Sequence, residues 1–345
     1  SIKRNGLYEE IIKACKQVKV KVVEHAGIEP NPRDEGIYQA ALTCRKHKVD
    51  LIIAAGGGSV IDAAKVIGIV ATNPQYKDAW AYVLNNGKVT KPSIPLFSII
   101  TLAATGSESN AGSVITNAKT HYKQSTETIS AIPLVCFEDP KYTLTLSWWQ
   151  TACGIFDIFS HLLEQYFDVK QQFNWTKEYL LANMRVCVDC AKKLKKNNQN
   201  YDARSNLLWT SSWALNGLAH FHTAGGDWMT HRLEHAVSGL WDVEHGAGLA
   251  LLTPHYLQYM TKRNKTFLAY ALEIGKSVFE TKTINEFFKA LDSFITLLGM
   301  PKKYTDFKQI NKVSDNDIKW LNTHFNKNVA GKAEMAKAVF NSVKR

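Results

Sequence analysis

The first part of the chain alternates apolar runs of strand length with amphipathic runs of helix length. Apolar residues recur at helical spacing in residues 6–18 and 34–47, which predicts two helices. Residues 18–23, 49–55, 93–100 and 132–137 are rich in β-branched and aliphatic side chains and predict strands. The Pro30 and Pro32 pair predicts a loop after the first of these strands. The order of elements predicts an α/β domain built on an open sheet.

Helical periodicity replaces this alternation in the second part of the chain. From Trp148 onward the strand signals become few, and long helical runs such as residues 176–195 dominate. We therefore expect an α/β domain over residues 1–145 and an all-α domain over residues 146–345. The chain of 345 residues is long enough for two domains, each with its own core.

A glycine-rich turn follows the predicted strand at residues 49–55. It reads Gly56–Gly57–Gly58–Ser59, and a helix opens behind it through Asp62. Consecutive glycines let backbone N–H groups approach a phosphate closely, and a helix N-terminus favours negative charge. The spacing matches neither of the two common nucleotide-binding glycine motifs, so a purely structural tight turn is the alternative reading.

A second small loop follows the predicted strand at residues 93–100. It begins at Thr101 and Leu102 and continues through Thr105–Gly106–Ser107–Glu108, with several hydroxyl side chains. Ligands of open α/β sheets bind at the carboxyl ends of the strands. We therefore expect the two loops to converge on one cofactor.

Two pairs of side chains four residues apart indicate a metal site in the second domain. Asp157 and His161 form one pair and His231 and His235 the other, and residues four apart share a helix face. Each pair alone is more often a surface pair or a core histidine. Asp157, His161, His231 and His245 together offer one carboxylate and three imidazoles without thiolate, a set that suits iron(II) or zinc(II) with a position left open for substrate. Spacing alone leaves three more histidines open as ligands, at positions 220, 222 and 255.

Charge and cysteine content narrow the functional classes. The net charge is +11, but the excess lies in helical stretches such as residues 192–196, with no nucleic-acid-binding module. We interpret it as a solvated basic surface and expect no nucleic-acid partner. Cys187 and Cys190 form a C-x-x-C within a helical run, which favours packing over redox or zinc chemistry. The six cysteines form no dense framework, and no apolar run would span a membrane, so we expect a cytoplasmic protein with no membrane partner.

The motifs together resemble the iron-containing (group III) alcohol dehydrogenases. The resemblance rests on the glycine turn running on to Lys65, on Thr105–Gly106–Ser107–Glu108 and on the two histidine stretches, and it extends from Ser1 to about Tyr256. The Gly226–Asp227–Trp228 lead-in before His231 is typical of the NADPH-dependent butanol dehydrogenase and aldehyde reductase branch. The resemblance implies a Rossmann-like domain followed by an all-helical domain, the dehydroquinate synthase-like fold.

The resemblance also implies roles for single residues. It implies metal ligation by Asp157, His161, His231 and His245, and it places His235 toward the nicotinamide and substrate. It implies NADP(H), in preference to NAD(H), as the cofactor, a small aldehyde or alcohol as the substrate, and a homodimer. The positions that match the family's cofactor contacts are Ser1, Gly57, Gly58, Ser59, Asp62, Thr101, Leu102, Asn110, Lys123, Tyr142 and Thr145.

The chain departs from the family pattern in three places. It starts at what looks like the last residue of the family's first glycine-rich turn, so we expect the first strand to be absent. Ser147 and Trp148 replace the usual proline, and the last twenty residues match the family poorly. Two alternatives stay open: a polyol dehydrogenase of the same superfamily, acting on glycerol or 1,3-propanediol, and a non-catalytic nucleotide- or metal-binding relic.

Overall fold

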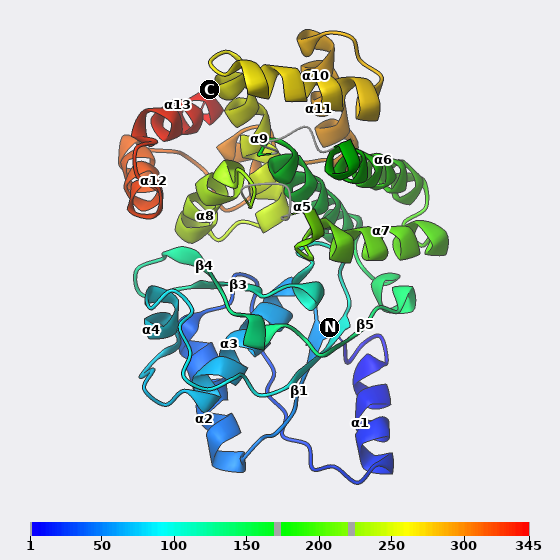
Figure 1. The fold of residues 1–345 in the computed structure, drawn as a ribbon, viewed down its shortest axis with the longest axis vertical. Coiled ribbons are helices and arrows are strands. Elements are labelled where there is room, and N and C mark those ends of the chain that lie inside the picture. The colour runs from blue at the N-terminus through cyan, green and yellow to red at the C-terminus, as the bar shows by residue number, and fades with distance from the viewer. Residues whose placement is uncertain (1, 169–173, 220–224, 345) are drawn as a thin grey trace. The chain divides into compact units, whose positions relative to one another are not determined.

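The chain forms two compact units in the computed structural model, which describes residues 2–168, 174–219 and 225–344 (Figure 1). The division falls between Leu146 and Ser147. The first unit contains every described strand, and the described part of the second unit is helical. Ser1, one of the expected cofactor positions, lies outside the described residues, as do His220 and His222.

A three-stranded parallel sheet organises the first unit. Its strands are β1 (Ile52–Gly56), β2 (Leu96–Ile100) and β5 (Val135–Phe137), in the order β1-β2-β5. Helix α3 (Gly58–Thr72) packs against β1 and β2 and also against α2 (Asp34–His47). The apolar core of this layer includes Ile37, Val66 and Ile115, each at most 1% exposed. The other elements of the unit are α1 (Leu7–Gln17), α4 (Ala79–Leu84), η1 (Ser107–Ser109), η2 (Ile129–Ala131) and η3 (Pro140–Thr143).

An antiparallel hairpin completes the first unit and was not expected from the sequence. Strand β3 (Gly112–Thr116) pairs with β4 (Lys123–Glu127), with Ile115 opposite Gln124. The Asn117 side chain organises the connecting turn, because its Oδ1 accepts hydrogen bonds from the backbone of Lys119 and Thr120. The hairpin is rich in polar residues, so its hydrophobic pattern carries no clear strand signal.

The expected strand at residues 18–23 is wrong. These residues form no strand, and none of the described strands pairs with them. Val18, Val20 and Val22 are 70%, 54% and 46% exposed. High β-propensity reflects packing on a half-buried surface, and without a neighbouring strand it does not produce one.

The second unit is a helical bundle in which α5 (Trp148–Tyr166) packs against α6 (Asn174–Lys196) and α9 (His245–Thr261) (Figure 1). Ser147 begins α5 with a capping box, since its hydroxyl accepts from the Gln150 backbone while the Gln150 side chain accepts from the Ser147 backbone. Serine therefore caps the helix where the family usually has proline. The other helices are α6 (Asn174–Lys196), α7 (Tyr201–Ala214), α8 (Met229–Trp241), α9 (His245–Thr261), α10 (Lys265–Phe279), α11 (Ile284–Leu298), η5 (Tyr304–Asp306), α12 (Asp315–Asn328) and α13 (Ala333–Val343).

Aromatic side chains fill the core of the bundle beneath α5. The ring centroids of Phe159 and Phe294 lie 5.1 Å apart, and Phe156 and Phe279 pack against the same pair. This aromatic core packs against the middle of α5, the helix that carries Asp157 and His161. Among the helices of the described residues, none combines the length and the apolar character that a membrane span requires.

Candidate functional site

The two loops at the carboxyl ends of β1 and β2 lie in contact. The Thr101 backbone N–H donates to the Gly56 carbonyl at 3.0 Å, directly beyond the paired strands. A Cβ atom on Gly58 would lie 2.3 Å from the Thr105 hydroxyl, so this position requires glycine. At Gly57 an added Cβ would lie 3.4 Å from the Leu102 side chain, an ordinary van der Waals contact. The glycine turn and the second loop therefore meet at the start of α3, as the strand order predicts.

Asp62 and Asn110 use their side chains to hold the second loop onto α3. Asp62 Oδ1 accepts from the Ser107 hydroxyl at 2.6 Å, and Oδ2 accepts from the Val114 backbone at 2.9 Å. The Asn110 amide donates to Gly106, and its oxygen accepts from the Gly112 backbone at 2.9 Å. Both residues were expected at the cofactor. The hydrogen bonds give them a structural part in shaping the loop.

Lys65 is buried beside this loop. Its ammonium donates to the carbonyl oxygens of Asn110 at 2.8 Å and Gly112 at 2.7 Å. Burial lowers the pKa of Lys65 to about 8, against the attraction of Asp62 and Glu108. Lys65 was not expected to take part in the site, although the D-x-x-K spacing on α3 places it one turn after Asp62.

The remaining expected cofactor positions lie in three parts of the first unit. Ser59, Thr101 and Leu102 are half-buried at the carboxyl edge of β1 and β2, while Lys123 is buried at the start of β4. Tyr142 and Thr145 follow β5. The Tyr142 hydroxyl donates to Glu10 of α1, and Thr145 is exposed.

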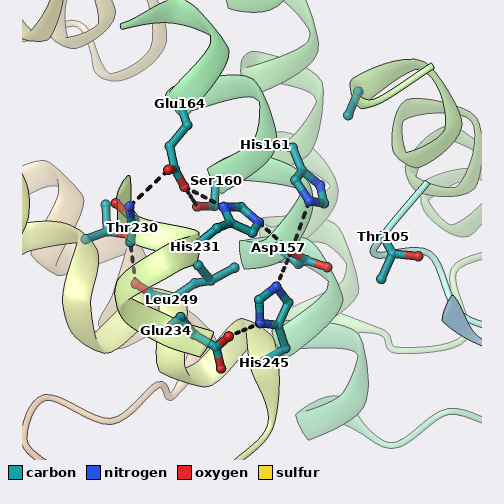
Figure 2. Close-up of polar contacts among 12 residues, drawn as sticks. Thr105, Asp157, Ser160, His161, Glu164, Thr230, His231, Glu234, His245 and Leu249 are labelled. Carbon is teal, nitrogen blue, oxygen red and sulfur yellow. Dashed lines mark hydrogen bonds and ion pairs between the residues drawn. The ribbon is translucent and has the colours of Figure 1, made fainter. Parts of the chain in front are cut away.

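Three helices of the second unit bring the candidate metal ligands together. Asp157 and His161 lie on α5, His231 on α8, and His245 is the first residue of α9. Figure 2 shows the three imidazoles arranged around the Asp157 carboxylate. Asp157 Oδ1 lies 3.5 Å from Nε2 of His161, 3.6 Å from Nε2 of His231 and 3.7 Å from Nε2 of His245. Asp157, His231 and His245 form one group whose ligand atoms all lie within 4.8 Å of one another, and His161 lies outside that group although its Nε2 is close to Asp157.

Two glycines allow the helices to approach this closely. A Cβ atom on Gly246 would lie 2.0 Å from the Cys153 carbonyl oxygen of α5. One on Gly248 would lie 2.9 Å from the Glu234 side chain of α8. The two glycines after His245 are therefore required by the close packing of α9 against α5 and α8.

The separations fit a shared metal ion better than hydrogen bonds. Donor and acceptor atoms of an N–H···O bond lie about 2.7–3.2 Å apart. Two ligand atoms at about 2.0–2.2 Å from a tetrahedral ion lie roughly 3.3–3.6 Å from each other. Among the described residues, Asp157 Oδ1 and His231 Nε2 are buried without a hydrogen-bond partner. Buried polar atoms of this kind need a partner, so one carboxylate and neutral imidazoles fit a divalent ion.

Burial and mutual pairing set the charges of the cluster. Burial raises the pKa of Asp157, but the imidazoles of His161, His245 and His231 oppose it and hold the net value well below its usual range. Burial lowers the pKa of His161 to about 3. Burial also acts to lower the pKa of His231, but Glu164 and Asp157 outweigh it and raise the value to about 10. Asp157 is therefore anionic and His161 is neutral, as ligand chemistry requires. The raised pKa of His231 favours its protonated form, so His231 must release the proton on Nε2 before that nitrogen can bind an ion.

Two glutamates that were not expected from the sequence contact the Nδ1 atoms of His231 and His245. These are the outer nitrogens of the two rings, because the Nε2 atoms face Asp157. Glu164 Oε1 lies 2.5 Å from His231 Nδ1, and the Glu234 carboxylate bonds His245 Nδ1. Glu164 follows Asp157 by seven residues on the same face of α5, and that periodicity could have indicated it. Glu234, His235 and His245 also form a group of potential ligands. Because His245 Nδ1 is bonded directly to Glu234, this grouping is explained by a hydrogen bond.

The Gly226–Asp227–Trp228 segment fixes the start of α8 beside α5. The Asp227 backbone N–H donates to the Glu164 carbonyl at 3.0 Å, and its carboxylate accepts from the Tyr256 hydroxyl at 2.6 Å. Trp228 has φ 53° and packs its ring 5.3 Å from that of His231, while an added Cβ on Gly226 would strike the same indole. The segment therefore positions His231.

The other candidate residues of the second unit, His255, Cys187 and Cys190, take part in packing and hydrogen bonding. His255 Nδ1 lies 2.9 Å from the Ser342 hydroxyl, which links α9 to α13, and His255 belongs to neither ligand group. Cys187 and Cys190 are buried in α6, and burial raises the pKa of both thiols. A raised pKa disfavours the reactive thiolate, so packing is the better reading of this pair.

Comparison with known proteins covers both units. Residues 1–140 match the family described as iron-containing alcohol dehydrogenase, and residues 151–337 match its C-terminal domain family. The probable NADH-dependent butanol dehydrogenase 1 of Bacillus subtilis is 35% identical, over 91% of this chain and 83% of that protein. The NADPH-dependent aldehyde reductase YqhD of Escherichia coli is also 35% identical, over 89% of this chain and 79% of that protein.

A solved structure and a more distant relative agree with these matches. The NADH-dependent butanol dehydrogenase A of Thermotoga maritima superposes with a TM-score of 0.90 at 29% identity, over 100% of this chain and 89% of that chain. More distantly, the 1,3-propanediol dehydrogenase of Klebsiella pneumoniae is 27% identical over 88% of this chain and 77% of that protein.

Proposed function

Because this chain belongs to the iron-containing alcohol dehydrogenase family and is an oxidoreductase, we propose that it interconverts small primary alcohols and aldehydes with a nicotinamide dinucleotide. Its more similar relatives are named butanol dehydrogenases and an aldehyde reductase. Butanal and butanol are accordingly the first substrates to test.

The proposed reaction centre is a divalent ion, iron(II) or zinc(II), held by Asp157, His161, His231 and His245. One observation carries the proposal: a single buried carboxylate oxygen lies 3.5–3.7 Å from the Nε2 atoms of three histidines. A surface pair or a core histidine, the alternatives for each pair alone, does not account for three imidazoles around one oxygen.

The ion, the nicotinamide and the protein side chains have separate roles in the proposed reaction. When bound, the divalent ion supplies Lewis acidity to the carbonyl oxygen and the nicotinamide supplies or accepts the hydride. Asp157 contributes the negative charge that holds the cation, and the histidines contribute neutral nitrogen ligands. His235, on the same helix as His231, is proposed to relay a proton to the product alkoxide, because imidazole titrates near neutral pH.

The proposed cofactor site is the carboxyl edge of the sheet in the first unit. Gly57, Gly58 and Ser59 at the start of α3 offer backbone donors and a favourable dipole to a pyrophosphate. NADP(H) is proposed in preference to NAD(H). The aldehyde reductase among the relatives uses NADPH, while the butanol dehydrogenases named above use NADH. Comparison of the Michaelis constants for the two cofactors tests the preference.

The decisive experiment combines turnover with metal analysis. The full chain is loaded with zinc(II) or iron(II) and mixed with butanal and NADPH, and the loss of NADPH absorbance is followed. We expect turnover that depends on the metal, and an Asp157→Asn variant that has lost both metal and turnover. A flat trace with either metal and with either cofactor contradicts the proposal. Metal bound without cofactor binding or turnover favours the non-catalytic alternative.

A polyol dehydrogenase is the second candidate, because a 1,3-propanediol dehydrogenase is among the relatives. A panel of butanol, 1,3-propanediol and glycerol separates the two by kcat/KM. We also propose a homodimer in the cytoplasm. Light scattering of the metal-loaded protein and fractionation of the source cells test these two points.

A further inference from the structure

The outer nitrogens of two candidate ligands are bonded to buried carboxylates. His231 on α8 is bonded through Nδ1 to Glu164 of α5, and His245 on α9 is bonded through Nδ1 to Glu234 of α8 (Figure 2). The Glu164 and Glu234 side chains are 2% and 0% exposed. His161 differs, because its Nδ1 is buried without a hydrogen-bond partner among the described residues.

We propose that Glu164 and Glu234 are positioning residues that fix the Nδ1–H tautomer of His231 and His245. A carboxylate is an acceptor only, so the histidine nitrogen that faces it carries the proton. The other nitrogen, Nε2, then presents its lone pair to the ion. This inference rests on the metal site proposed above.

The surroundings keep each glutamate in place before any ion binds. Glu164 accepts from the Ser160 hydroxyl at 3.1 Å and from the Thr230 backbone N–H at 3.0 Å. Glu234 accepts from the Ser238 hydroxyl, and Gly248 leaves room for its side chain. Carboxylates held in this way orient the rings without further reorganisation.

The balance of buried charges gives a second reason to expect that the two glutamates support metal binding. Asp157, Glu164 and Glu234 place three carboxylates within one cluster, each at most 3% exposed. Buried charges are costly unless paired. A divalent ion offsets two of the three charges, and the hydrogen bonds from the imidazoles satisfy the outer carboxylates. The glutamates therefore favour a dication at the centre as well as orienting the rings.

Metal affinity of single variants tests the inference. Competition with a chromophoric chelator measures zinc(II) binding to the wild-type chain, Glu164→Gln and Glu234→Gln. Loss of such outer contacts typically weakens metal binding about 10–100-fold, and we expect that range for each variant. Glu244→Gln is the matched control, because Glu244 precedes His245 but is exposed. It removes one charge near the site without touching an imidazole, and its affinity should stay within about twofold. Wild-type affinity in both glutamine variants overturns the proposal.

A spectroscopic signature separates positioning from a merely structural role. In the zinc-loaded wild type, nitrogen NMR of labelled histidines should assign the proton of His231 and His245 to Nδ1. Zinc on Nδ1 of either ring contradicts the inference. If a glutamine variant does not fold, the wild-type tautomers still decide the question. Retention of metal by Asp157→Asn would instead refute the metal site itself, which keeps the two failures distinct.

Discussion

The Ser107 hydroxyl donates a 2.6 Å hydrogen bond to Asp62 and so joins the loop after β2 to helix α3, 45 residues earlier in the chain. Asp62 and Ser107 are 8% and 2% exposed. Ser107→Ala would leave Asp62 Oδ1 buried without this donor. An unsatisfied buried group costs about 1–3 kcal/mol, so we expect that loss in the free energy of unfolding, measured with denaturant.

The control for this variant is Ser109→Ala in the same short turn. The Ser109 hydroxyl donates to the Gly106 carbonyl at 3.0 Å, and this hydrogen bond stays within its own turn. A smaller loss is expected. Equal losses would mean that the Asp62 contact carries no special weight.

Lys65→Met should destabilise the first unit more strongly. The buried ammonium satisfies the carbonyl oxygens of Asn110 and Gly112, which methionine cannot do. It also removes the larger of the two positive charges, Lys65 and Lys123, that act to lower the pKa of Asp62. Removing one partner of a buried charged network costs about 3–5 kcal/mol. Denaturant unfolding of this variant is compared with that of Lys77→Met, which removes an exposed lysine and should be nearly neutral.

His231 and His235 should respond differently to alanine substitution. His231 Nε2 lies 3.6 Å from Asp157 Oδ1, so His231→Ala should lose metal and activity together. His235 does not belong to the group formed by Asp157, His231 and His245. His235→Ala should keep its metal and lose mainly kcat. Metal content by mass spectrometry and steady-state kinetics measure both effects. Equal loss of metal in the two variants would refute the division.

Asp227 should make the second unit lose stability as the pH rises from about 4 to 7. Burial raises the pKa of its carboxyl from 3.8 to about 7, and the hydrogen bond from Tyr256 only partly offsets this. Between these values the folded state holds a proton that the unfolded state has released. The free energy of unfolding therefore falls with pH, by at most about 1.4 kcal/mol per pH unit, and this contribution is constant above pH 7.

The Asp227→Asn variant isolates that contribution. Relative to the wild type, it should gain stability between pH 4 and 7 and show no further gain above 7, in unfolding curves measured across this range. Asp50→Asn, at an exposed position, should keep a constant difference from the wild type. A constant difference for Asp227→Asn as well would show that its carboxyl does not titrate in this window.

Local signals in the sequence were sufficient for several elements. The predicted helix at residues 34–47 is α2 with the same bounds, and the strand, glycine turn and helix around Gly56 are all present. The reason is that helix periodicity, glycine turns and caps depend on neighbouring residues. The helical pairs Asp157 with His161 and His231 with His235 lie on α5 and α8 for the same reason.

Contacts between segments distant in the sequence decided the strand pairing and the composition of the metal site. Residues 18–23 have strand composition but no partner strand, and the polar β3–β4 hairpin forms because its two strands pair with each other. Spacing could not reveal that Asp157, His231 and His245 share one centre, or that Glu164 and Glu234 reach the outer nitrogens of two histidines. The sequence alone determined the ligand types and the helix faces that carry them. Only the tertiary structure decided which of them meet, because their meeting depends on the close packing of three helices at Gly246 and Gly248.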